Sequence, residues 1–147
     1  MKKIVIYIDG GARGNPGPAA AGMVLCNEKG EAFKQYSQYL GDMLTNNEAE
    51  YKALIFALAK VKALFGSKLV KNQEIEVCSD SELMVKQMQG GYKVLDEKIQ
   101  PLFLTAWNLR LDFKKIKLKL IPREKNKEAD RLVNEALDAE VQPRRLF

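Results

Sequence analysis

The chain has 147 residues, of which 46% are hydrophobic and 29% are charged. This length and apolar content suit one globular domain, and they exclude a disordered chain, a collagen-like repeat and two cores of ordinary size. Histidine is absent, which excludes Ser-His-Asp triads, His-bound metals and imidazole bases, so any catalysis must use carboxylates, Lys, Tyr, Ser, Thr or metal ions.

Compartment signals in the sequence point to the cytoplasm. Cys26 and Cys78 lie far apart in a chain that is too large to need disulfide staples, which favours a reducing compartment. The apolar run from Ile4 to Ile8 is shorter than the roughly 7 residues of the shortest signal-peptide core, and no run approaches the roughly 18 apolar residues of a membrane span. We therefore expect a cytoplasmic protein with no membrane partner.

The first half of the chain predicts a three-stranded antiparallel meander followed by a helix. The segment from Ile4 to Ile8 is apolar on both faces, as in a central strand, and this strand is expected to end at Asp9. From Asn47 the apolar period becomes helical and continues to a stop at Gly66. The three strands are predicted at residues 4–8, 21–25 and 32–40.

The second half alternates strands and helices. From residue 115 to 120 lysines alternate with Ile and Leu, which is the pattern of a strand near a sheet edge. A strand at 75–79, a helix at 81–89, a helix before Asp112 and a last helix from 129 complete the order β-β-β-α-β-α-α-β-α. We expect a single domain over residues 1–140 and a C-terminal tail over residues 141–147.

The net charge of +5 is unevenly distributed. Between Arg110 and Lys127 the chain carries eight basic residues and two acidic ones. Such a basic stripe suits a polyanion such as nucleic acid. A solvated, lysine-rich face that keeps the protein soluble explains the charge equally well.

A glycine-rich loop at residues 10–18 follows Asp9. It lacks the Gly-Lys-Ser/Thr ending of a phosphate-binding loop, and its two prolines prevent a helix from starting there. An acid beside Gly10 and Gly11 at the end of a buried strand indicates a place where other backbone or a ligand comes close. A hairpin-like loop that Asp9 merely caps is the structural alternative.

Three further acids occupy positions with ready structural explanations. Glu50 ends the segment 47–50, which has capping-box spacing at the start of the long helix. Asp80 follows a predicted strand and precedes Ser81, a suitable helix cap. Asp130 lies in the first turn of the last helix, where an acid favours the helix dipole. Taken alone, each position can be explained without a function.

Taken together, Asp9, Glu50, Asp80 and Asp130 fit a different pattern. Two follow central strands and two lie in the first turns of helices, so all four can meet at one end of one sheet. Four converging carboxylates repel one another unless cations neutralise them. Mg²⁺ or Mn²⁺ suits such oxygen ligands, and two ions about 3.5 to 4 Å apart can activate water and stabilise the leaving oxygen of a phosphodiester.

Four stretches of the chain together resemble the signature segments of type 1 ribonuclease H. They follow the family's order and span nearly the whole chain, at residues 9–18 (DGGARGNPGP), 45–51 (TNNEAEY), 79–81 (SDS) and 126–132 (NKEADRL). The resemblance implies the family's α/β fold, a ribonuclease H-like five-stranded mixed sheet with the first three strands antiparallel and helices on both faces. That fold agrees with the order of elements expected from the periodicity.

The resemblance also implies an activity. It implies an endoribonuclease that hydrolyses the RNA strand of RNA/DNA hybrids with two Mg²⁺ ions, for which Mn²⁺ can substitute, leaving 5′-phosphate and 3′-hydroxyl ends. By motif, Asp9 would bridge both ions, Glu50 and Asp80 would hold the ion on the leaving-group side, and Asp130 would hold the ion on the water side. Glu48 is not expected to be catalytic, because the family's essential glutamate corresponds to Glu50.

The same motifs imply contacts to the substrate. Because the 2′-hydroxyl is what distinguishes RNA from DNA at a site, groups near the catalytic acids are expected to contact it or the neighbouring backbone. The residues expected to bind substrate are Gly10, Gly11, Arg13, Asn15, Thr45, Asn46 and Asn47.

This sequence departs from bacterial members of the family in two ways. The loop before the last helix has no histidine, and Arg123, seven residues before Asp130, resembles archaeal-type members; we expect an auxiliary catalytic role for it, with a phosphate-steering or surface arginine as the alternative. The segment 90–93 links two helices directly, so the family's basic protrusion is absent. Substrate grip is then expected from the basic stripe with Lys86 and Lys93.

A second class of function stays open, namely a catalytically silent module with the same fold that binds RNA/DNA hybrids or RNA. The complete set of four acids argues against it, because clustered carboxylates weaken the binding of a polyanion. A purely structural sheet domain does not explain why the acids fall at these positions. We expect a monomer, and the sequence leaves open whether double-stranded RNA is also cut.

Overall fold

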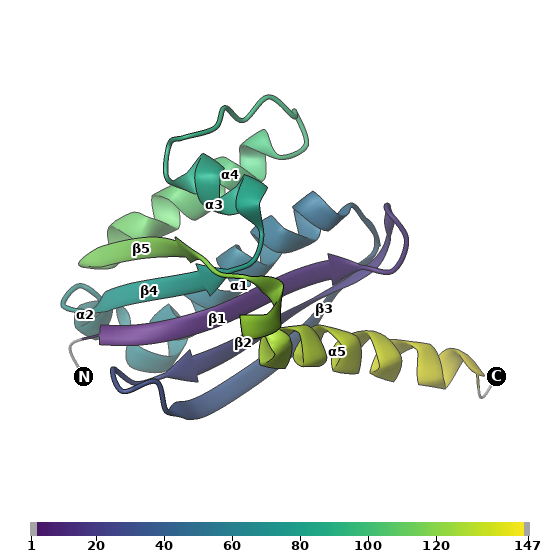
Figure 1. The fold of residues 1–147 in the computed structure, drawn as a ribbon, viewed down its shortest axis with the longest axis horizontal. Helices are drawn as coiled ribbons and strands as arrows, with labels where there is room; N and C mark the ends of the chain where they lie inside the picture. The colour runs from purple at the N-terminus through teal and green to yellow at the C-terminus, as the bar shows by residue number, and fades with distance from the viewer. Residues whose placement is uncertain (1–2, 146–147) are drawn as a thin grey trace.

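The computed structural model describes residues 3–145, with side chains described for residues 3–140. Its centre is a five-stranded sheet with strand order β3-β2-β1-β4-β5 (Figure 1). The strands are β1 (Lys3–Ala12), β2 (Gly17–Cys26), β3 (Ala32–Leu44), β4 (Glu74–Ser79) and β5 (Lys115–Leu120). The helices are α1 (Asn46–Phe65), α2 (Ser67–Val70), α3 (Glu82–Met88), α4 (Gln100–Leu109) and α5 (Lys127–Arg145), with 3₁₀ turns η1 (Arg110–Asp112) and η2 (Arg123–Lys125).

The sheet is mixed. β2 pairs antiparallel with both β1 and β3, whereas β4 pairs parallel with β1 and with β5. The predicted fold class is therefore confirmed, including the antiparallel arrangement of the first three strands. Because parallel neighbours run in the same direction, the C-terminal ends of β4 and β5 lie at one edge of the sheet, beside the second half of β1.

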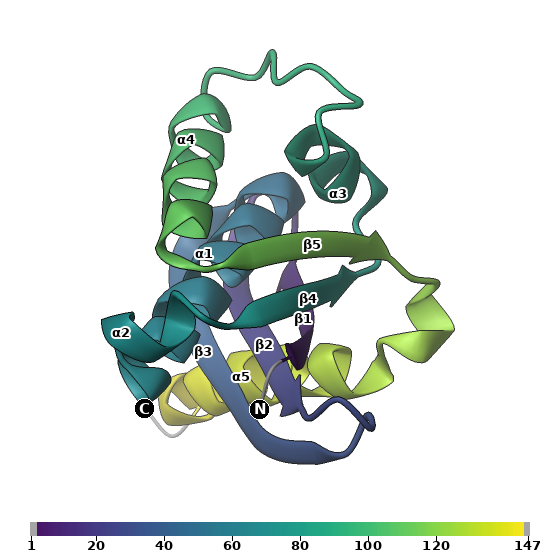
Figure 2. The same cartoon turned by 90° about the vertical axis from the view of Figure 1, so that its left-hand side faces the viewer.

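Helices cover the two faces of the sheet unequally (Figures 1 and 2). On one face α1 packs across β1 and β2, with α4 beside it. On the other face α5 packs over β2, β3 and β1. We call these the α1 face and the α5 face. Among the described residues, no helix lies over β4 and β5 on the α5 face (Figure 1).

Alternation along β1 divides its side chains between two cores. Ile4, Ile6 and Ile8 are buried on the α1 face, where they join one large core with residues of α1 such as Leu54. Val5 is buried on the α5 face in a smaller core. This two-sided burial is what the apolar run predicts for a central strand.

β1 is longer than the sequence predicts. The strand does not end at Asp9, because residues 10–12 pair with residues 19–21 of β2 and carry it on to Ala12. Glycines normally signal a turn rather than a strand interior, which hides this extension in the sequence. Asp9 therefore lies inside a strand, and the residues before and after it both pair with β2.

The main differences in the helices are at α2 and at the two ends of α5, which starts at Lys127 rather than at residue 129. The short helix α2 follows α1 after Gly66 and has no counterpart among the predicted elements. α5 continues to Arg145, so residues 141–145 of the predicted tail have helical backbone. Residues 146–147 lie outside the described residues, and a tail separate from the domain stays a prediction.

Two glycines allow helices to touch the backbone of the sheet. A Cβ atom on Gly10 would lie 2.1 Å from the carbonyl oxygen of Ala49 in α1. A Cβ atom on Gly22 would lie 2.4 Å from the carbonyl oxygen of Ala129 in α5. Gly22 is the cross-strand partner of Asp9, and Gly10 is its chain neighbour. Both helices therefore approach the sheet most closely beside Asp9.

None of the helices within residues 3–145 is long and apolar enough to cross a membrane. The cytoplasmic location and the monomeric state expected from the sequence stay predictions.

Gly10→Ala should destabilise the protein by about 1 to 3 kcal/mol or more, because the atom it would strike is backbone and cannot rotate away. Gly11→Ala is the matched control, since its Cβ atom would lie at an ordinary 3.6 Å from Val133 Cγ1. Urea unfolding should show a lower midpoint for Gly10→Ala alone. Equal midpoints for the two variants would contradict the close packing of α1 on β1.

Candidate active site

Asp9 and Asp80 come from neighbouring parallel strands. Tyr7 of β1 is the register partner of Cys78 of β4, so Asp9 and Asp80 each follow two residues later at the same edge of the sheet. Val5 and Tyr7 lie on the α5 face, and strand alternation places Asp9 on that face too. There the Asp9 carboxyl is hydrogen-bonded to the Asp130 carboxyl.

Glu50 is positioned by the start of α1 and by α3. The hydroxyl of Ser81 donates a hydrogen bond of 2.6 Å to Glu50 Oε2, and the same hydroxyl accepts from the Met84 amide to cap α3. One serine therefore both begins a helix and orients the carboxylate of Glu50.

The capping box of α1 is not the one expected from the sequence. Thr45 is the N-cap, its hydroxyl accepts from the Glu48 amide, and the Glu48 carboxylate accepts from the Thr45 amide. The capping acid is thus Glu48, and the predicted capping spacing of residues 47–50 was wrong. Glu50 has no part in that capping box, so helix capping no longer accounts for its position.

Asn126 links the strands to the last helix. Its side chain is buried, and Nδ2 donates a 2.8 Å hydrogen bond to the carbonyl oxygen of Ile8, the residue before Asp9. A hydrogen bond from the same side chain works against the rise in the pKa of Asp80, and the backbone carbonyl oxygen of Asn126 accepts from the Asp130 amide at 3.1 Å. Asn126 therefore touches the segments that carry three of the four predicted acids.

Burial and the charges of neighbouring acids raise the pKa of three of the four carboxyl groups. Burial, followed by the charges of Asp80, Asp130 and Glu50 and by the hydrogen bond to Asp130, raises the pKa of Asp9 to about 8. Burial raises the pKa of Glu50, against the hydrogen bond from Ser81. Burial likewise raises the pKa of Asp80. The structure therefore brings the four predicted acids together at one place.

The chemistry of this donor set fits a hard divalent cation, which prefers carboxylate oxygens. As the side chains stand, Asp9 bonds to Asp130 and Glu50 bonds to Ser81. Within the described part of the chain, no group of three or more His, Cys, Asp or Glu side chains is already arranged around one point as metal ligands would be. A cation would therefore require these carboxylates to rotate toward it.

Arg123 lies beside this cluster. Its positive charge opposes the rise in the pKa of Glu50 and of Asp80. Together with Glu124, Lys127 and Asp130 it lines an open hollow at the start of α5. Arg123 is therefore the basic side chain that sequence reasoning placed near the acids, and its catalytic role stays a prediction.

The side chain of Arg13 is already bound to other residues of the protein. Its guanidinium forms a 2.7 Å ion pair with Asp138 and a hydrogen bond with Asn134, both in α5. A substrate phosphate would have to compete with these two exposed side chains for Arg13. The structure thus gives Arg13 a first role in joining the β1–β2 loop to α5.

The other predicted substrate residues gather where the β1–β2 loop meets α1. Asn15 Oδ1 accepts from the Asn46 amide, and Asn46 Oδ1 accepts from the Ala12 amide, each at 3.0 Å. Gly10 is buried against α1, while Gly11 is half-buried. Thr45 and Asn47 complete the group, at the N-cap of α1 and in its first turn. Their contacts to substrate stay predictions.

Sequence reasoning missed three residues that build the site. Asn126 lies in one of the four motifs, but only the structure shows that its buried side chain bonds to the backbone of β1. Ser81 was expected to cap a helix, and nothing in the sequence indicates its bond to Glu50. The role of Gly22 follows from its register opposite Asp9, which a sequence does not reveal.

Without divalent cations, Asp9→Asn should stabilise the protein increasingly as pH rises. Folding raises the pKa of Asp9 from 3.8 to about 8. The protonated carboxyl therefore contributes to the free energy of unfolding in full below about pH 4, and this contribution is lost as pH rises through about 8. In a chelating buffer the melting temperature of wild type should fall behind that of Asp9→Asn by about 2 to 4 °C for each kcal/mol lost.

Glu97→Gln is the control for this experiment, since it removes an exposed acid outside the cluster. A difference between wild type and Asp9→Asn that stays constant from acid to alkaline pH would contradict the raised pKa of Asp9.

Comparison with solved structures supports the fold. LC11-RNase H1, isolated from compost by a metagenomic approach, is 48% identical, with a TM-score of 0.87 over 96% of this chain and 99% of that one. The same protein in complex with an RNA/DNA hybrid is 47% identical, with a TM-score of 0.88 over 94% of this chain and 99% of that one.

Two curated relatives cover nearly all of this chain. Ribonuclease HI of Halobacterium salinarum is 39% identical over 92% of this chain and 65% of its own length. The bifunctional protein Rv2228c of Mycobacterium tuberculosis is 39% identical over 95% of this chain, which spans only 37% of that longer protein. A family profile described as "Reverse transcriptase-like" matches residues 7–136. With these matches and the fold described above, the chain belongs to the ribonuclease H family.

Proposed function

We propose that this protein is an endoribonuclease that hydrolyses the RNA strand of RNA/DNA hybrids and leaves 5′-phosphate and 3′-hydroxyl ends. The observation that carries the proposal is the meeting of Asp9, Glu50, Asp80 and Asp130 at one edge of the sheet, where each of three acids has a raised pKa. Clustered carboxyl groups with raised pKa values are typical of a catalytic site rather than of a surface that only binds a polyanion.

The substrate class is supported by the relatives. LC11-RNase H1, whose structure with an RNA/DNA hybrid is known, aligns with 94% of this chain at 47% identity. At that level of identity a shared substrate class is the simplest expectation, although fold alone would not support it.

The four carboxylates would hold two Mg²⁺ ions, and Mn²⁺ is the expected substitute. When bound, the ions would supply an activated water and stabilise the leaving oxygen of the phosphodiester. Asp9 lies in the middle of the group and interacts with the other three acids, which suits it to bridge the ions. Glu50 and Asp80 would lie on the leaving-group side and Asp130 on the water side.

The chain's own residues prepare the cluster for this task. The Ser81 hydroxyl holds Glu50 and the Asn126 amide holds Asp80, so two of the four ligands are oriented before substrate arrives. The protonated Asp9 carboxyl would release its proton as a cation binds. Arg123 offsets part of the negative charge and can meet a substrate phosphate from η2, just before α5.

RNA would be distinguished from DNA at the junction of the β1–β2 loop and α1. The hydroxyl of Thr45 accepts from the Glu48 amide and can still donate its own proton to a phosphate oxygen. Asn15, Asn46 and Asn47 lie at the same helix start, where backbone amides and side-chain amides can contact a 2′-hydroxyl.

The main test is cleavage of end-labelled RNA/DNA hybrid, RNA/RNA, DNA/DNA and single-stranded RNA, each with Mg²⁺, with Mn²⁺ or with chelator. We expect metal-dependent cutting of the RNA strand of the hybrid, and a loss of at least about 10²-fold in kcat for Asp9→Asn, as for removal of one charge-stabilising group. Cutting of RNA/RNA would extend the substrate class. Hybrid that binds but stays intact under both metals would leave only the binding-module hypothesis.

Arg123 can be tested separately. If its charge assists the cluster, Arg123→Ala should lower kcat by roughly 10-fold or more with a smaller effect on KM, as expected for a group whose interaction strengthens in the transition state. Arg123→Lys keeps the charge and should retain most of the activity. A change in KM alone would assign Arg123 to phosphate steering instead.

A further inference from the structure

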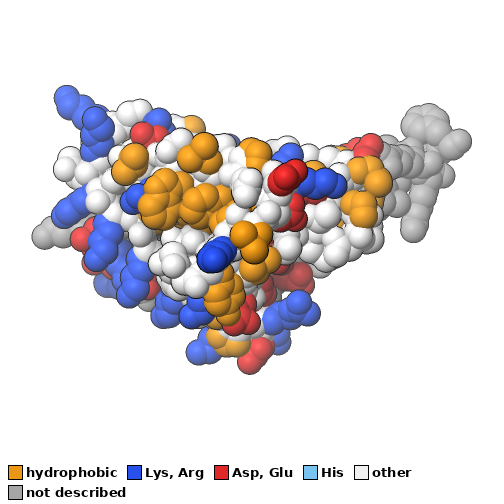
Figure 3. Space-filling model, turned by 90° about the horizontal axis from the view of Figure 1, so that it is seen from above, with side chains coloured by type: hydrophobic (Ala, Val, Ile, Leu, Met, Phe, Trp, Pro, Cys, Tyr) orange, Lys and Arg blue, Asp and Glu red, His pale blue; other side chains and the backbone are white. Residues whose placement is uncertain are grey.

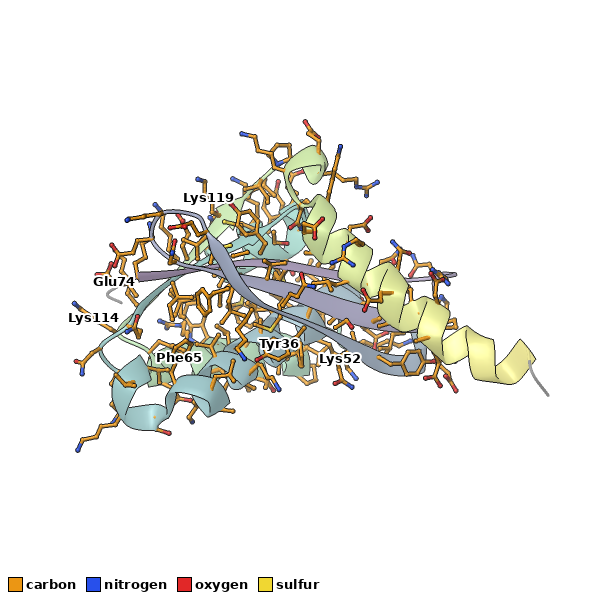
Figure 4. All side chains as sticks on the ribbon, turned by 90° about the horizontal axis from the view of Figure 1, so that it is seen from below. Tyr36, Lys52, Phe65, Glu74, Lys114 and Lys119 are labelled. Carbon is orange, nitrogen blue, oxygen red and sulfur yellow. The ribbon has the colours of Figure 1, made fainter. Side chains whose placement is uncertain are left out.

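The α5 face of β5 carries a straight row of cations. Ile116 and Leu118 of this strand belong to the core on the α1 face, so the alternate residues point to the opposite side. These are Lys115, Lys117 and Lys119, which are all exposed; we call them the lysine row. Figure 4 shows Lys119 on the side of the sheet that carries α5, away from Tyr36 and Phe65.

The lysine row is open to a ligand. α5 packs over β2, β3 and β1, and no helix among the described residues lies over this part of the sheet (Figure 1). β5 is also an edge strand. Figure 3 shows Lys and Arg side chains concentrated at the end of the molecule where β5 begins and along the adjoining edge.

The neighbouring strand offsets the charge of the row only in part, since Glu74 and Glu76 line a hollow with Lys115 and Lys117 but not with Lys119. β4 places Glu74 and Glu76 beside Lys115 and Lys117, but these two acids form their ion pairs with other lysines. Glu74 pairs with Lys114 at 4.0 Å and Glu76 pairs with Lys3 at 3.6 Å. Within the described residues, no carboxylate lies within 4.0 Å of an amino group of the row. The amino groups of the row are therefore not held in close ion pairs and can turn toward a phosphate.

The row leads to the catalytic cluster. Lys119 is the register partner of Cys78, two residues before Asp80. After β5 the chain passes into η2, where Arg123 lies beside Glu50 and Asp80. The half-buried ring of Tyr7, on the same face, lines a hollow with Lys125. Cations thus continue from the row toward the acids, and a half-buried ring lies on the same face of the sheet.

We propose that the lysine row binds the backbone of a single-stranded nucleic acid extension that flanks the hybrid, and so favours substrates with such an extension. Successive lysines of the row are about 6.6 Å apart along the strand, a spacing similar to that of neighbouring phosphates on an extended strand. A row one lysine wide suits one backbone, and a nearby aromatic ring suits an unstacked base. The inference rests on the proposed function and adds a preference to it.

Lysines on an edge strand also discourage edge-to-edge pairing. That role requires only charge at the edge and predicts no effect on substrate preference. The experiment below therefore compares nucleic acids that differ only in a single-stranded extension.

The test uses a blunt RNA/DNA hybrid and the same hybrid with a single-stranded DNA extension at either end. Wild type should show a KM several-fold lower for one extended hybrid than for the blunt one, with equal kcat. K115Q/K117Q/K119Q should raise the KM of the extended hybrid more than that of the blunt hybrid, so that the difference between the two substrates is lost. K34Q/K68Q/K71Q, which removes three exposed lysines elsewhere, should behave as wild type.

A second readout does not depend on cleavage. Binding of labelled single-stranded DNA, measured by anisotropy at several salt concentrations, should weaken in K115Q/K117Q/K119Q, and the slope of log affinity against log salt should fall by about 2, near 0.7 for each lost phosphate contact. Melting curves show whether the variant is folded.

The two proposals fail in different ways. If wild type cuts no hybrid but the row still governs single-strand binding, the proposed activity is wrong and the row stands. If wild type cuts blunt and extended hybrids with the same KM, the single-strand preference is overturned. It is also overturned if the triple variant raises the KM for both hybrids by the same factor, and that result would assign the row to binding of the duplex.

Discussion

The carboxylate cluster depends on two places where a helix touches the sheet backbone directly. Gly10 follows Asp9 and faces α1, and Gly22 lies opposite Asp9 and faces α5. A side chain at either position would strike a carbonyl oxygen of the helix. Because both contacts flank one residue, α1 can bring Glu50 and α5 can bring Asp130 to the acid at the centre of the sheet. The position of the site is thus determined by backbone packing rather than by the charges of the acids.

This arrangement works against the stability of the folded chain. Burial and the charges of the neighbouring acids both disfavour the ionised Asp9 carboxylate, and together they raise its pKa. The large apolar core on the α1 face and the polar links through Ser81 and Asn126 hold the groups together despite it. Such a cost is expected where a site is prepared for a cation or substrate that supplies the missing positive charge.

The sequence predicted the parts of the fold that depend on periodicity, and it missed those that depend on register. Ile4 to Ile8 indicated a central strand, and Gly66 marked the end of α1. The extension of β1 to Ala12 depends on pairing with β2, and the position of Gly22 opposite Asp9 depends on the same register. Motif order identified the four acids together, but the ion pair of Arg13 with Asp138 and the capping role of Glu48 required coordinates.

The most direct test of this account is calorimetric titration of Mn²⁺ into wild type and Asp9→Asn. The account places Asp9 at the centre of a cation site that the other three acids complete. Wild type should bind Mn²⁺ and release protons on binding, because the Asp9 carboxyl must ionise. Asp9→Asn should bind the ion far more weakly and without that proton release. Equal affinity and equal proton release in the two proteins would contradict the account.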